Sequence, residues 1–182
     1  MTASEHVLIL LSLVISLALA HILSNLARLI QSENVTWSWL HGVWVFFVVL
    51  LLIDFWISVW QLRLEGDWNI LMVFFWMTMA ILNYLLSALV VPDQVLEDGM
   101  NLGDFHDVNR KRFMSVFLAI LLFAFGANLM LEGFSSANYI VGLMVVCVSL
   151  VGFTRQKALQ WAGTIGTGLL WIVYFSVFMS NF

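Results

Sequence analysis

Residues 43–60 read VWVFFVVLLLIDFWISVW, and Asp54 is the one charged residue among them. A run this apolar approaches the roughly 20 residues that a helix needs to cross the hydrocarbon of a bilayer. The run therefore predicts a transmembrane helix, extending from about residue 40 to about residue 62. It also places an ionisable side chain at membrane depth.

Runs of similar character fill most of the chain, which has 182 residues and is 63% hydrophobic and 10% charged. A soluble domain is about half apolar and about a quarter charged, so a soluble fold is excluded. Because the connections are short, consecutive helices should be antiparallel. We therefore predict an all-α fold, a six-transmembrane-helix up-and-down bundle forming a single transmembrane domain over residues 1–182. The expected spans are about 7–30, 40–62, 69–91, 112–131, 137–154 and 159–180, with a loop at 92–111.

The seven basic residues divide unequally between the two ends of the expected spans. Basic residues in short loops stay on the cytoplasmic side, so the richer side is predicted to be cytoplasmic. Both chain termini then lie outside, and the 92–111 loop lies inside. Loops this short suit a multi-pass protein of a bacterial inner membrane. Only Arg63 flanks the outer side, whereas Arg28, Arg110, Lys111, Arg112, Arg155 and Lys157 flank the inner side.

Several function classes are disfavoured by composition. The net charge of -4 would repel nucleic acid. Cys147 is the only cysteine, so no intrachain disulfide is expected, and no sequence motif of a nucleophilic or phosphate-binding site is present. Haem binding between two membrane histidines is disfavoured because only His21 falls well inside a span. We expect no enzyme activity, no metal and no cofactor.

Polar residues recur at spacings of four and three along the first two spans, which places them on one face of each helix. An ionisable group in hydrocarbon costs at least about 2.5 kcal/mol, so it needs a partner, a water-filled cavity or a function. A carboxylate and an imidazole can relay protons, so Asp54 and His21 are the expected titratable stations. The alternative is that these groups only hold the helices together. The expected path residues are His21, Asn25, Asp54, Ser58, Gln61 and Asn83.

The 92–111 loop contains the densest polar chemistry of the chain. Asp104, His106 and Asp107 include the donor types of a divalent metal site, but residues so close in one segment rarely complete such a site. The favoured reading is that Asp104 caps a helix start and that the segment lies along the membrane interface. The following basic run is expected to anchor the inner side and contact anionic lipid, as is Arg28 at its own helix end. That run is Arg110, Lys111 and Arg112.

Small residues interrupt the last span at Gly163, Gly166 and Thr167. Such residues let membrane helices approach closely, either within one chain or between subunits. Since six short helices enclose only a narrow path, a homo-oligomer is expected.

The leading hypothesis is a small channel or transporter that passes protons or a small cation along the polar faces of the first three helices. The alternative is a non-transporting interaction protein, or a subunit of a larger membrane complex.

Overall fold

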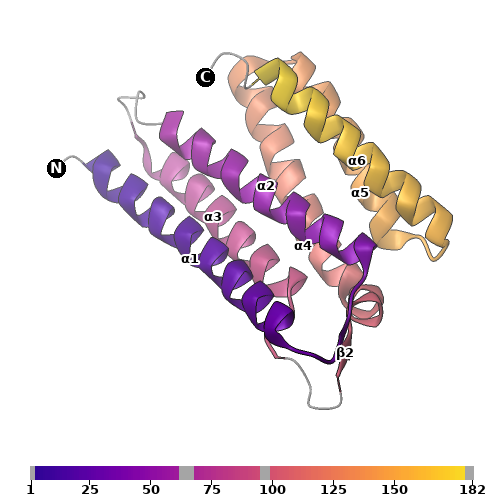
Figure 1. Cartoon of the computed structure of the whole chain (residues 1–182). Coiled ribbons are helices and arrows are strands. Elements are labelled where there is room, and N and C mark those ends of the chain that lie inside the picture. Colours follow the sequence, from indigo (N-terminus) through magenta and orange to yellow (C-terminus); the bar gives the residue numbers. More distant parts are fainter. Residues whose placement is uncertain (1–2, 62–67, 95–98, 179–182) are drawn as a thin grey trace. The chain divides into compact units, whose positions relative to one another are not determined.

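The computed structural model describes residues 3–61, 68–94 and 99–178. Within these ranges the chain forms six helices, each long and apolar enough to cross a membrane, which confirms the predicted all-α, six-helix architecture (Figure 1). Arg63, which was counted in the charge argument, lies outside the described residues. The helices are α1 (Ala3–Gln31), α2 (Trp39–Gln61), α3 (Ile70–Val90), α4 (Leu102–Glu132), α5 (Ser136–Phe153) and α6 (Lys157–Phe178).

The predicted spans agree with the helices to within a few residues except at α4, which begins at Leu102 and not near residue 112. The amphipathic segment before the apolar run is continuous with it, because nothing between them breaks a helix. The cap also differs from the prediction. The side-chain oxygen of Asn101, and not of Asp104, accepts hydrogen bonds from the backbone N–H groups of Gly103 (2.8 Å) and Asp104 (3.4 Å).

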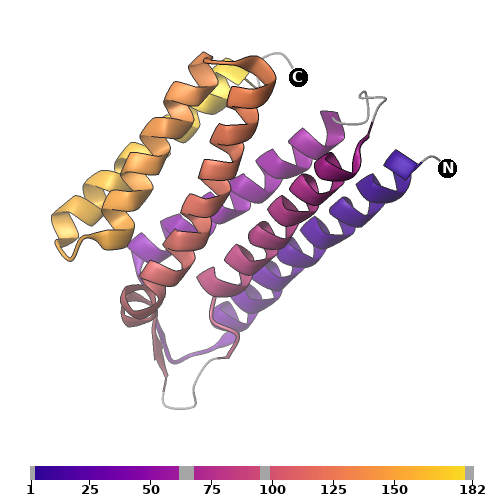
Figure 2. The same ribbon diagram turned by 180° about the vertical axis from the view of Figure 1, so that it is seen from behind.

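The chain separates into two compact units, Met1–Asn109 and Arg110–Phe182. In the first unit α1 packs most extensively on α3 and less on α2 (Figures 1 and 2). In the sequence α2 lies between α1 and α3 and runs antiparallel to both, so α1 and α3 run in the same direction. Buried apolar side chains such as Ile22 on α1, Val48 on α2 and Leu86 on α3 form the core of this unit.

Two short strands join the connections at one end of the first unit. Strand β1 (Val35–Thr36) follows α1, and β2 (Met100–Asn101) precedes α4, and the two pair in parallel. Gly99 precedes β2 with φ of +95°, and a Cβ at this position would lie 2.9 Å from the carbonyl oxygen of Asn34. Only glycine meets both conditions without strain. This pairing brings the starts of α2 and α4 close together.

Helix α3 ends at Val90, two residues before Pro92, the only proline of the sequence. Pro92 disfavours helical backbone at the residue before it, and Val91 is extended, with φ of −119° and ψ of 135°. The chain then turns toward α1, which places Asp93 beside that helix.

The second unit depends on close approach of α5 and α6, which pack extensively on each other (Figure 2). A Cβ at Gly163 would lie 2.6 Å from Cγ2 of Val151 and 2.8 Å from the carbonyl oxygen of Cys147. A Cβ at Gly166 would lie 2.9 Å from Sγ of Cys147. The hydroxyl of Thr167 donates to the carbonyl oxygen of Gly163 (2.9 Å), so it needs no partner on another helix. The small residues of α6 therefore lie at a contact within one chain.

We expect Gly163→Ala to lower the free energy of unfolding by about 1–3 kcal/mol, because the added methyl overpacks a contact with the backbone of α5. Thermal unfolding in detergent micelles measures this. The matched control is Gly126→Ala on α4, where no atom lies within 4 Å of the new Cβ and the better helix propensity of alanine should leave stability equal or higher. Equal losses in both variants would contradict the close packing of α5 on α6.

Candidate functional site

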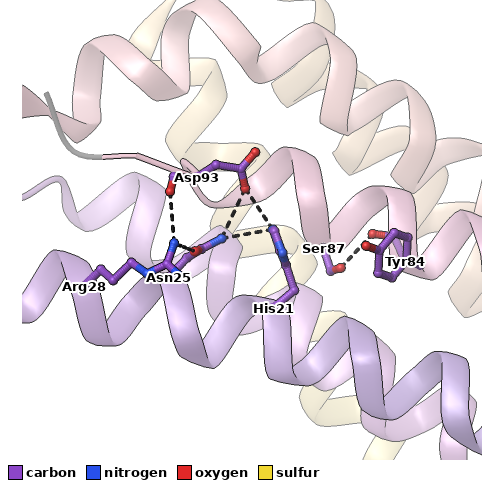
Figure 3. A network of polar contacts seen from close by, with 6 residues as sticks. All are labelled: His21, Asn25, Arg28, Tyr84, Ser87 and Asp93. Carbon is purple, nitrogen blue, oxygen red and sulfur yellow. Dashed lines mark hydrogen bonds and ion pairs between the residues drawn. The ribbon is translucent and has the colours of Figure 1, made fainter.

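A polar network joins α1 to the segment after α3 within the first unit (Figure 3). Nε2 of His21 lies 3.2 Å from Oδ1 of Asp93, and the side-chain amide of Asn25 donates to the same oxygen at 3.3 Å. The guanidinium of Arg28 donates to the backbone oxygen of Asp93 and to Oδ1 of Asn25, both at 3.3 Å. Three side chains spaced along one face of α1 thus converge on one residue.

His21 has a polar neighbour in either of its protonation states. Its Nε2 also lies 3.0 Å from the amide nitrogen of Asn25. When Nε2 carries a proton it donates to the Asp93 carboxylate, and when it does not it accepts from the Asn25 amide. Because Arg28 holds the oxygen of that amide, the NH₂ group of Asn25 faces His21 and Asp93. A proton can therefore leave or join His21 while Nε2 keeps a hydrogen-bonding partner.

The members of the network differ in exposure, and Arg28 is exposed. The side chain of Asp93 is 70% exposed and that of His21 25% exposed, whereas Asn25 is 3% exposed. The lengths of the helices agree with a place near the membrane boundary. Helix α3, with 21 residues, spans about 31 Å and matches the hydrocarbon thickness, whereas α1, with 29 residues, spans about 43 Å. Since Asp93 follows the end of α3, the network lies at one end of this helix, beside the buried interior of the unit.

The ring of Tyr84 on α3 lies near His21, with ring centroids 6.5 Å apart. One turn along α3, the buried hydroxyl of Ser87 donates to the backbone oxygen of Tyr84 at 2.6 Å (Figure 3). These two residues form the α3 side of the network.

The other expected path residues mostly bond within their own helices. The hydroxyl of Ser58 donates to the carbonyl oxygen of Asp54 (3.0 Å), and the amide of the buried Asn83 donates to that of Met79 (2.9 Å). Oδ1 of Asn83 has no hydrogen-bond partner within the described residues. Asp54 is half-buried and Gln61 is exposed. The structure thus joins His21 and Asn25 to Asp93, a residue that was not among the expected path residues.

A groove of about 310 Å³ runs between α1 and α2, lined by Ile15, Ser16, Leu19, Leu52, Ile53 and Trp56. The hydroxyl of Ser16 donates to the backbone oxygen of Ser12, so its proton is not available to a ligand in the groove. None of the six expected path residues contributes to this groove.

The three basic residues near the start of α4 differ in burial. Arg110 is buried, whereas Lys111 and Arg112 are exposed. Nearby, Asp104 and Asp107 are exposed while His106 is buried, so these three side chains do not face one place. Within the described residues no group of three or more histidine, cysteine, aspartate or glutamate side chains is arranged to hold a metal ion.

Sequence reasoning did not foresee two features. The first is Asp93, whose approach to α1 depends on the turn at Pro92 and on the parallel packing of α1 and α3. The second is a pair of buried histidines, His41 on α2 and His106 on α4, with ring centroids 5.9 Å apart. The only sequence signal for that pair was two histidines near helix starts at the same expected end of the bundle.

Comparisons of the chain with protein-family models, with curated proteins and with solved structures gave no match.

We expect Asn25→Ala to lower the free energy of unfolding by about 1–3 kcal/mol, because it removes a buried amide that joins three polar groups. Asp93→Asn should cost less than about 1 kcal/mol, because an exposed ion pair contributes little. Denaturant unfolding of both variants, with the exposed neighbour Ser24→Ala as a control, checks this order. A larger loss in Asp93→Asn than in Asn25→Ala would show that the carboxylate, and not the amide, holds the network together.

Proposed function

We propose that the protein is a small channel or transporter of a bacterial inner membrane that passes protons or a small cation along α1, α2 and α3. The observation that carries the proposal is that the side chain of Asp93, which is 70% exposed, lies 3.2 Å from Nε2 of His21, which is 25% exposed. A carboxylate open to water beside a half-buried imidazole is the arrangement that a proton relay needs at its entrance.

The neighbouring chemistry supports the same reading. Nε2 of His21 keeps a partner with or without its proton, which reduces the energetic penalty of each transfer. Deeper along the unit, the buried Asn83 presents a carbonyl oxygen that no described group satisfies, and such an acceptor suits a water molecule or a passing cation. Asp54 of α2 supplies a second titratable station within a span.

Assembly and orientation complete the proposal. Three helices enclose only a narrow path, so we propose that the functional form is a homo-oligomer. We place both termini outside, which puts the network at the cytoplasmic end, and by the charge rule we also place the exposed Lys111 and Arg112 on the cytoplasmic side. These two side chains and Arg28 are then available to anionic lipid headgroups.

One observation favours the alternative of an interaction protein. The groove between α1 and α2 is almost wholly apolar, which suits a transmembrane helix of another polypeptide better than it suits an ion. In this alternative the Asp93 network only stabilises the packing of α1 against α3.

Proton flux into liposomes separates the two functions. We expect His21→Asn and Asp54→Asn each to lower flux by at least about tenfold, since asparagine hydrogen-bonds but does not relay a proton. Both variants should elute from a sizing column like the wild type, and Ser24→Ala should conduct normally. If correctly folded wild type is silent from about pH 5 to 8, where imidazoles titrate, the transport proposal fails and the interaction protein takes its place.

The orientation can be tested with single cysteines in a Cys147→Ser background. Ser136 is the first residue of α5, next to the connection from α4, and Gln156 lies between α5 and α6; both positions are exposed. We expect an impermeant maleimide added to intact cells to label residue 136, and to label residue 156 only after the membrane is opened. The reverse pattern would place both termini in the cytoplasm.

A further inference from the structure

The start of α2 and the start of α4 bring two buried histidines together within the first unit. His41 is 2% exposed and His106 is 1% exposed, and their ring centroids lie 5.9 Å apart with the rings inclined at 77°. The pairing of β1 with β2 immediately precedes both helix starts and holds them side by side. The sequence separates these residues widely, so their juxtaposition belongs to the fold.

His41 requires a partner that the described residues do not supply. Neither Nδ1 nor Nε2 of this imidazole has a hydrogen-bond partner among them. A buried polar group in this condition is costly, and in native proteins it usually marks a bound water or ion. The ring of Phe105 packs edge to face at a centroid distance of 5.5 Å, so the surroundings are partly apolar.

The separation of the two rings suits one ion shared between them. A metal lies about 2.0 Å from an imidazole nitrogen, which puts two ring centres about 6.3 Å apart in a linear arrangement and about 5.2 Å apart in a tetrahedral one. The observed 5.9 Å lies between these limits. The distance between the ring centroids is therefore compatible with an ion bound by one nitrogen of each ring.

The surroundings favour a singly charged ion. Asp104 and Asp107 are exposed, and no described group of three metal-ligating side chains adds a carboxylate to the pair. A doubly charged ion would be harder to bury here, and zinc prefers four ligands. Imidazole is a good ligand for copper.

We propose that His41 and His106 bind one monovalent copper ion, through one nitrogen of each ring. This site lies outside the His21 network, and it does not depend on the proposed transport because binding is measured at equilibrium without flux.

The test uses the full chain in detergent micelles, in a Cys147→Ser background, with Cu⁺ maintained by ascorbate and a chromophoric Cu⁺ chelator as competitor. We expect the protein to retain one ion per chain. His41→Leu and His106→Leu should each lower the affinity by at least about 100-fold, since loss of a ligand exceeds the effect of losing a supporting partner. His21→Asn, which removes a histidine outside the pair, is the matched control and should retain the ion.

X-ray absorption of the loaded protein adds a readout that does not depend on the variants folding. We expect two nitrogen ligands at about 2 Å and no sulfur ligand. The site is disproved by a wild type that loses all copper to the chelator, by sulfur ligation from methionine, or by His41→Leu retaining the ion. Retention of Zn²⁺ in preference to Cu⁺ would overturn the assignment of a monovalent ion.

Discussion

In hydrocarbon a polar group finds no water, so each one must be satisfied by the protein itself, and the rest of this structure depends on that constraint. Many hydroxyl groups of the described spans meet it locally, by donating to a carbonyl oxygen one turn back along their own helix, as Ser16, Ser58 and Thr167 do. Contacts between helices are then left to apolar and small side chains. His21 and Asn25 are different because their hydrogen bonds reach another segment of the chain, which makes them the natural place to look for chemistry.

The helices could be predicted from the sequence because a membrane-spanning helix needs a run of roughly 20 apolar residues, and such a run is evident from composition alone. The largest difference between an expected span and a helix, at the start of α4, occurs where a polar segment continues the helix. Hydropathy has no signal there, and the decisive cue is the side chain of a single asparagine, Asn101. Fold class follows from averages, whereas helix ends follow from individual hydrogen bonds.

The candidate site was predictable only in part, for a related reason. Helical spacing places His21 and Asn25 on one face, and the structure joins them. Their partner could not be predicted, because Asp93 reaches them through a proline turn and through the packing of α1 against α3, which are two spans apart in sequence. Asp54 was singled out by its depth in an apolar run, but depth alone does not indicate which side chains meet.

The short pairing of β1 with β2 has a consequence for the order in which the protein is built. Its first strand leaves the ribosome with the connection after α1, but its second strand follows only after α2 and α3. During synthesis the first strand must therefore wait while two further helices enter the membrane. Until the later strand arrives, the starts of α2 and α4 cannot be held together, and His41 has no second imidazole beside it. A chain interrupted after α3 would contain three of its helices but not the closed end that joins them.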